Sequence, residues 1–172
     1  KAVFTLAATG PSPGNATLLN YVSSATPANN FAKLATGSPI SAGFGLAYLN
    51  TTTNLTARVD SSLGITGNWA AGVLAATATL AFTRDAAPDG PYSALKVGIA
   101  PVDSDSVALS VLDMDVTAPV GSDHAEVGQT QVRFGRLRLL NAYGSELLPL
   151  RVPVRTEYFN GTTWALNVDD SC

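Results

Sequence analysis

Short runs of alternating apolar and polar residues recur along this chain, separated by turn-forming Gly, Pro, Asn and Ser. No stretch of about 12 residues has a stripe with the 3.6-residue period of a helix. The first two thirds of the chain contain eight candidate strands: Val3–Ala8, Leu18–Val22, Phe31–Leu34, Phe44–Leu49, Leu55–Val59, Val73–Thr83, Leu95–Ala100 and Val107–Leu112. This pattern predicts an all-β protein.

The clearest alternation lies in the last third of the chain. One face of an extended segment is apolar and comprises Leu148, Leu150, Val152, Val154 and Tyr158. The other face comprises Pro149, Arg151, Pro153, Arg155 and Glu157. A period of two predicts a strand with one buried face and one solvent face. Because proline has no N–H to donate, the strand should be an edge strand or contain bulges.

The segments on either side of this strand complete a predicted meander. Thr130–Leu140 precedes it as a partner strand, and Asn141–Ser145 forms the turn between them. After it, Asn160–Gly161 is a strong two-residue hairpin signal that leads into Thr162–Leu166. Three consecutive antiparallel strands are therefore expected.

Strand spacing also predicts the domain organisation. Short strands at these intervals are typical of sandwiches, so residues 1–117 are expected to form an immunoglobulin-like β-sandwich. A Pro- and Gly-containing stretch, Ala118–Gly128, marks the border. Residues 118–172 are expected to be a β-rich meander segment, part of a longer domain.

Composition narrows the compartment and the partners. The 172 residues are 46% apolar and only 13% charged, with a formal net charge of -3. A net negative charge disfavours binding to the phosphate backbone of nucleic acids. No apolar run is long enough to span a bilayer. The single cysteine, Cys172, excludes an internal disulfide. Most of the polar residues are Thr, Ser and Asn, a composition typical of secreted bacterial cell-surface proteins. An extracellular location is therefore expected.

The charges are segregated along the chain. Val97–Val132 contains six acids and no Lys or Arg, whereas five of the seven arginines follow between Arg133 and Arg155. Closely spaced carboxylates are the ligands that calcium prefers. The candidate ligands are Asp103, Asp105, Asp113, Asp115 and Asp123. A solvated acidic edge is the alternative, because the glycine of a calcium loop is missing. The arginines are expected to pair across strands with Glu146, with Glu157 or with the acidic segment.

Five aromatic residues are candidates for stacking on sugars: Trp69, Tyr92, Tyr143, Tyr158 and Trp164. Aromatic rings bind glycans when they are exposed, and otherwise they pack in cores or across strands. Nucleophilic catalysis is not expected, since the only histidine is His124 and the chain has no G-x-S-x-G elbow, P-loop or His/Cys cluster. The third function class is a hydrolase that uses two carboxylates in a cleft.

A family resemblance rests on one long segment. FGRLRLLNAYGSELLPLRVPVRTEYFNGTTWALNVDDSC, from Phe134 to Cys172, resembles a domain of unknown function in MshQ-type proteins, which are associated with the mannose-sensitive haemagglutinin (MSHA) type IV pilus. Ala87–Leu109 and Asp123–Gly128 are also similar to that domain. Because members of that family are longer, the resemblance implies that Cys172 is an internal position.

The resemblance implies an exported pilus or cell-surface protein with a structural or adhesive role. We therefore expect a non-enzymatic module whose partners are other subunits of a pilus or surface fibre, contacted through β-strands. The alternative is a carbohydrate-binding module of a surface adhesin, with glycans as its ligands. Neither hypothesis requires a cofactor, and calcium at the aspartates named above is the one candidate.

Overall fold

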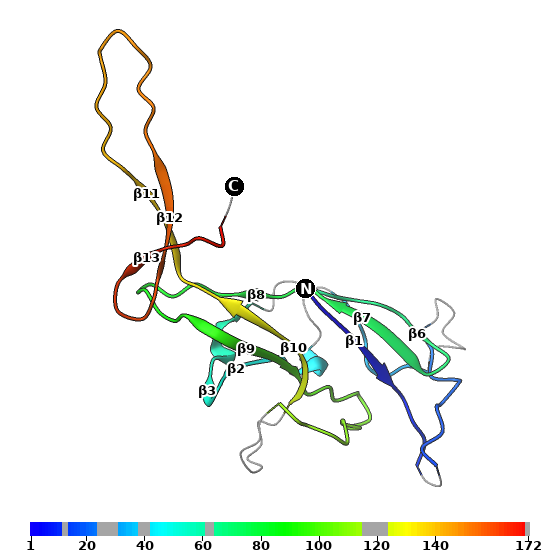
Figure 1. The fold of residues 1–172 in the computed structure, drawn as a ribbon. Coiled ribbons are helices and arrows are strands. Elements are labelled where there is room, and N and C mark those ends of the chain that lie inside the picture. The colour runs from blue at the N-terminus through cyan, green and yellow to red at the C-terminus, as the bar shows by residue number, and fades with distance from the viewer. Residues whose placement is uncertain (12–13, 24–30, 38–41, 61–63, 115–123, 171–172) are drawn as a thin grey trace. The chain divides into compact units, whose positions relative to one another are not determined.

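The structure is a computed structural model that describes residues 1–11, 14–23, 31–37, 42–60, 64–114 and 124–170 (Figure 1). Strands dominate these ranges, which contain short 3-10 helices but no α-helix, so the all-β prediction is confirmed. None of the helices in the described ranges has the length and hydropathy of a membrane span. The predicted border between residues 117 and 118 lies outside the described residues, as do Asp115, Asp123 and Cys172.

The chain divides into two compact units. Unit 1 comprises Lys1–Thr83 and Leu95–Gln129, and unit 2 comprises Arg84–Ala94 and Thr130–Cys172. Unit 2 is therefore built from a short internal segment as well as from the C-terminal third of the chain.

Two four-stranded antiparallel sheets account for most of the strands. The first contains β1 (Ala2–Ala7), β5 (Ile65–Thr66), β6 (Trp69–Ala70) and β7 (Val73–Ala78), in the order β1-β7-β5 with β6 also on β7. The second has the order β10-β9-β2-β3 and contains β2 (Ala47–Asn50), β3 (Thr53–Asn54), β9 (Tyr92–Ile99) and β10 (Ala125–Val132). A further pair joins β4 (Val59–Asp60) to β8 (Ala81–Phe82).

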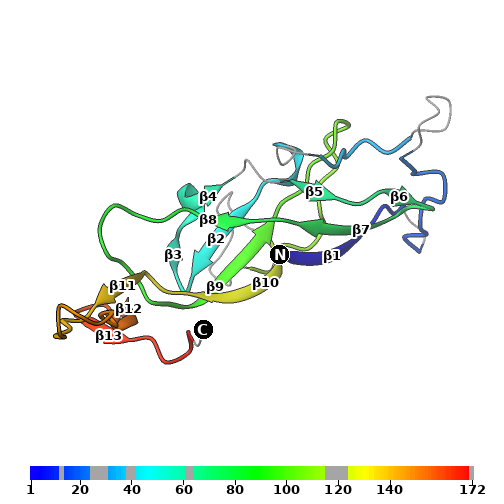
Figure 2. The same ribbon diagram turned by 90° about the horizontal axis from the view of Figure 1, so that it is seen from above.

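The core of the first sheet follows from the alternation in β1. Its even-numbered residues face inward, while Val3, Thr5 and Ala7 are exposed. Leu6 lies opposite Leu74 of β7, which belongs to the main hydrophobic cluster, and the partly buried Leu6 packs against that cluster. The prediction of a strand over Val3–Ala8 is thus confirmed within one residue, and Figure 2 shows β1 alongside β7.

Several predicted strands are wrong. Leu55–Val59 contains the 3-10 helix η3 (Thr56–Arg58), because the Asn54 side chain accepts the Thr56 N–H (2.9 Å) and turns the chain. Phe44 ends another 3-10 helix, η2 (Ala42–Phe44), and the strand β2 begins only at Ala47. Three other predicted strands contain no strand in the described residues: Leu18–Val22, Phe31–Leu34 and Val107–Leu112.

Unit 2 contains the predicted meander. β11 (Gly135–Leu139), β12 (Val154–Phe159) and β13 (Trp164–Leu166) form an antiparallel sheet in sequence order. Beyond β11 and β12 the hairpin continues as two extended segments joined by a loop (Figure 1). We call residues 140–153 the arm.

The prediction of a buried apolar face on Leu148–Tyr158 is wrong in this structure. Strand β12 starts only at Val154. The exposed fractions of Leu148, Leu150, Val152 and Val154 are 71%, 51%, 46% and 55%. Sequence alternation assigns these side chains to one face, and the strand register shows it for Val154, which lies opposite Leu139. They stay exposed because the described residues of unit 2 contain no second sheet to cover them.

Candidate functional site

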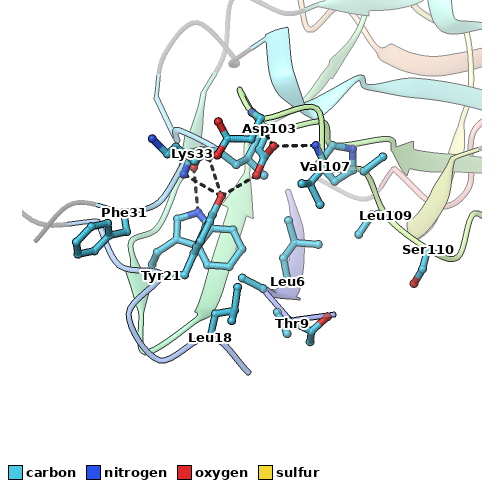
Figure 3. Close-up of a pocket in the computed structure, with 18 of the residues that line it drawn as sticks. Leu6, Thr9, Leu18, Tyr21, Phe31, Lys33, Asp103, Val107, Leu109 and Ser110 are labelled. Atoms are coloured by element: carbon cyan, nitrogen blue, oxygen red, sulfur yellow. Dashed lines mark hydrogen bonds between the residues drawn. The ribbon is translucent and has the colours of Figure 1, made fainter. Parts of the chain in front are cut away.

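A hollow of about 680 Å³ opens on the surface of unit 1 (Figure 3). We call it the Tyr21 hollow. Its lining is mainly apolar with a few polar groups and includes Leu6, Leu18, Tyr21, Phe31, Lys33, Trp69, Asp103, Val107 and Leu109. It combines residues from β1, from the loops on either side of Tyr21 and from the 101–110 loop.

Tyr21 organises this hollow through its hydroxyl and its ring. The hydroxyl accepts hydrogen bonds from the backbone N–H of Lys33 (2.8 Å) and Leu34 (3.1 Å) and donates one to Asp103 Oδ2 (3.3 Å). The ring packs edge-to-face on Trp69, with centroids 4.8 Å apart. Burial raises the pKa of the Tyr21 hydroxyl above its ordinary value. The hydroxyl is therefore neutral, and in this loop region it satisfies backbone N–H groups that would otherwise need a neighbouring strand.

The Asp103 carboxylate accepts hydrogen bonds from the backbone of its own loop. Its Oδ1 accepts the backbone N–H groups of Asp105 and Val107, both at 2.9 Å, and so caps the turn between them. Asp113 Oδ1 accepts the Glu126 N–H (3.0 Å). Over the described ranges no three His, Cys, Asp or Glu side chains gather in a way that would hold a metal ion. Calcium binding by the full five-aspartate set stays a prediction, because two of its members lie outside these ranges.

The five aromatic candidates are distributed over both units. Trp69 belongs to unit 1 and is 5% exposed, with its Nε1 donating to Leu34 O (3.0 Å), so its ring packs rather than offering a face. The other four belong to unit 2. Tyr143 on the arm is 93% exposed. Tyr158 lies under Arg133 at 4.6 Å, and Tyr92 donates its hydroxyl hydrogen to Asp89 (3.0 Å).

One face of the unit 2 sheet is a ladder of rings and guanidinium groups. Trp164 stands at its centre, with its ring centroid 6.1 Å from that of Phe134 and 5.9 Å from that of Phe159. Arg136 lies over the Trp164 ring at 3.8 Å, and Arg84 lies over the Phe134 ring at 4.0 Å. Cation–π contacts and ring packing thus replace an aliphatic core in this small sheet.

Glu157 joins this ladder to the arginines of β11. It is 4% exposed, and its carboxylate accepts hydrogen bonds from Arg136 (2.9 and 2.7 Å) and Arg138 (3.2 Å). The cross-strand pairing of arginines with Glu157 is confirmed. The hydrogen bonds from Arg136 and then from Arg138 hold the pKa of this carboxyl below its ordinary value, against the opposing effect of burial.

The lowered pKa makes the stability of unit 2 depend on pH. Since the folded-state pKa is the lower one, the stabilisation from Glu157 is fully present above the unfolded pKa of about 4.3 and is lost as the pH falls through the folded pKa. We expect the β11–β13 sheet to open on acidification below about pH 4, as measured by backbone amide exchange. Glu157→Gln is the control: it should lose this acid transition, and an identical pH profile in the variant would contradict the assignment.

The opposite face of the same sheet carries exposed aliphatic side chains. Leu137 and Leu139 of β11 share it with Val154 of β12, because Leu139 pairs directly with Val154. Leu137 and Leu139 are 73% and 70% exposed. Together with Leu148, Leu150 and Val152 of the arm, they form what we call the apolar face. Monomeric proteins rarely leave so continuous a patch open, so it has the character of an interaction surface.

Two parts of these sites are not apparent in the sequence. Tyr21 lies in a stretch that the sequence predicts as a short strand, and its partner Asp103 is 82 positions away. Arg84 reaches the β11 backbone, donating to Gly135 O (3.1 Å) across 51 positions. Only a prediction of long-range contacts would reveal either residue.

The comparisons with known proteins concern unit 2. Residues 133–172 match the model of the fourth domain of the DUF6701 family. No curated protein and no solved structure matches the chain. The protein is thus an all-β protein with several antiparallel sheets, and its C-terminal meander is similar to that DUF6701 domain.

Proposed function

We propose that this protein is a structural module of an exported bacterial cell-surface or pilus-associated protein, and that it assembles through β-strand contacts. The apolar face of unit 2 carries the proposal. Its six aliphatic side chains expose a surface on the order of the ~800 Å² that each partner contributes to a standard interface. Such a surface favours a bound partner over open solvent.

One further observation supports the surface and pilus assignment. The DUF6701 match covers residues 133–172, the region whose sequence resembles MshQ-type proteins of the MSHA pilus. In this proposal the two sheets of unit 1 form an immunoglobulin-like sandwich that acts as a spacer.

A cell-fractionation experiment tests this function. In a bacterium that expresses the tagged protein, we expect it in the sheared surface fraction and accessible to protease on intact cells. A variant with Leu137→Ser, Leu139→Ser and Val154→Ser should fold but be retained several-fold less in that fraction. Leu19→Ser with Val168→Ser is the matched control, because both side chains are exposed outside the apolar face. Recovery of the wild type only from the cytoplasm would overturn the proposal.

A carbohydrate-binding module is the second candidate. The exposed Tyr143 ring at the arm favours it, since an open ring can stack on a sugar. Binding to a glycan array that Tyr143→Ala abolishes would support this role over a purely structural one.

A further inference from the structure

The arm has one hydrogen-bonding edge that is free. The Phe159 N–H donates to Phe134 O, and the Leu140 N–H donates to Pro153 O, both at 2.9 Å. On the β12 side, the backbone N–H and C=O groups of odd-numbered residues therefore point toward β11. Even-numbered residues bond outward, as Asn167 N–H shows by donating to Thr156 O (3.0 Å). Strand β13 and Asn167 cover this outer edge only as far as Thr156.

Beyond Thr156 the outer edge remains available for pairing. In the described part of the chain, no backbone hydrogen bond involves Leu150 or Val152. Both prolines, Pro149 and Pro153, occupy odd positions on the inner edge. The outer positions Leu150 and Val152 therefore keep N–H groups that can pair, whereas the Leu148 N–H donates to Ser145 O (3.2 Å) within the arm. The same even-numbered residues carry the apolar side chains. The prolines block one edge of this segment and leave the other edge able to pair at Leu150 and Val152.

Unit 1 has a complementary edge. Ala8 N–H donates to Gly72 O (2.8 Å), so the even-numbered residues of β1 bond to β7. The backbone groups of Val3, Thr5 and Ala7 point the other way, and β1 is the last strand on that side of its sheet. A row of unpaired N–H and C=O groups is a template for another strand.

A groove of about 490 Å³ lies beside this edge, and we call it the β1–β10 groove. Its walls come from β1 and from the start of β10, and Ile99, fully buried, contributes to its lining. Phe4 and Leu6 line it from β1 and Val127 lines it from β10. The groove therefore combines these apolar side chains with the polar groups of Thr5, Asp113 and Glu126 at the point where the first sheet ends.

We propose that residues 148–154 of one copy add to β1 of a second copy as a parallel strand that closes this groove. In a parallel pair of strands, a residue whose backbone N–H and C=O point toward the other strand lies beside a residue whose N–H and C=O point away from the first strand. Leu150 and Val152 would then lie beside even-numbered β1 residues such as Phe4, on the groove side. An antiparallel strand would instead put Arg151 and the two prolines into the groove. This inference rests on the proposed function and names its partner.

Charge favours a second copy as the occupant. Two acids line the groove, Asp113 and Glu126, and Glu126 also pairs with Lys96 (2.9 Å). The segment Arg133–Glu157, which includes the arm, contains five arginines and two glutamates. Opposite charges on the two surfaces speed association and fix orientation. Because the arm and the groove are different surfaces of one chain, the contact is heterologous and extends head to tail.

Sedimentation of the 172-residue chain over a range of concentrations tests this contact. We expect the wild type to form concentration-dependent oligomers. Leu150→Pro removes an outer N–H and should weaken association at least about tenfold. Arg151→Pro, its neighbour on the inner edge, is the matched control and should associate like the wild type within about threefold. Thr5→Pro removes an outward N–H of β1 and should also abolish oligomers.

A mixture of the two blocked variants separates this contact from others. Leu150→Pro retains its groove and Thr5→Pro retains its arm, so together they should form dimers and nothing larger. Continued association of Thr5→Pro alone would show that arms pack on arms and would overturn the proposal. A wild type that is monomeric at every concentration would also overturn it, while leaving the surface-fractionation test of the proposed function intact.

A competitor provides a readout that does not depend on the folding of any variant. A synthetic peptide of residues 147–155 should dissociate wild-type oligomers. The same peptide with N-methyl groups on Leu150 and Val152 should not. Equal effects of the two peptides would contradict strand addition.

Discussion

Replacing Trp164 by alanine should destabilise unit 2 by about 2–3 kcal/mol, the cost expected for a partly buried tryptophan with a cation–π partner. The substitution removes the ring that Phe134 and Phe159 contact and over which Arg136 lies. Because this ladder replaces an aliphatic core, its loss should open the whole sheet. Backbone amide exchange in β11, β12 and β13 should accelerate by about 30-fold or more.

Tyr143→Ala is the matched control for this variant. Both residues are aromatic and both belong to unit 2, but the Tyr143 side chain is almost fully exposed. Its loss should change the free energy of unfolding by less than about 0.5 kcal/mol. Equal effects of the two substitutions would mean that the ring ladder does not stabilise the sheet.

Replacing Leu74 by alanine should have the largest effect in unit 1, about 3 kcal/mol. The side chain is fully buried in the main hydrophobic cluster, opposite Leu6 of β1, and a cavity would remain in its place. The free energy of unfolding is measured by denaturant titration. Since Leu74 backs β1, the variant should also weaken any assembly that uses this strand.

Val73→Ala tests whether this effect is specific to the core. Val73 precedes Leu74 in β7, but its side chain points to the other face and is 38% exposed. We expect a cost below about 1 kcal/mol. If Val73→Ala cost as much free energy of unfolding as Leu74→Ala, the assignment of the core to the Leu74 face of β7 would be contradicted.

Local signals predicted the C-terminal meander well. Its strands are consecutive, so each pairing is set by a nearby turn, and the Asn160 side chain accepts the N–H groups of Thr162 and Thr163 to shape the last one. The pairing of Arg136 and Arg138 with Glu157 follows from the same short-range alternation. Where contacts are local, the pattern of residue types is sufficient.

Predictions failed where a distant group competes for the backbone. The stretch around Tyr21 resembles a short strand, but its hydroxyl binds the Lys33 and Leu34 N–H groups and holds a loop. Glu157 belongs to the face expected to contact solvent, yet it is almost fully covered. Alternation separates two faces but does not say which of them becomes buried.

The sequence by itself determined that this protein is built from antiparallel strands, that the arm alternates apolar and polar residues, and that its prolines share one edge. Only the tertiary structure decided which surfaces remain open. It left the apolar face exposed, covered Glu157, and ended the first sheet at β1 beside a groove. The physical reason is that a strand's two faces and two edges are fixed by period two, whereas their burial depends on which distant segments pack against them.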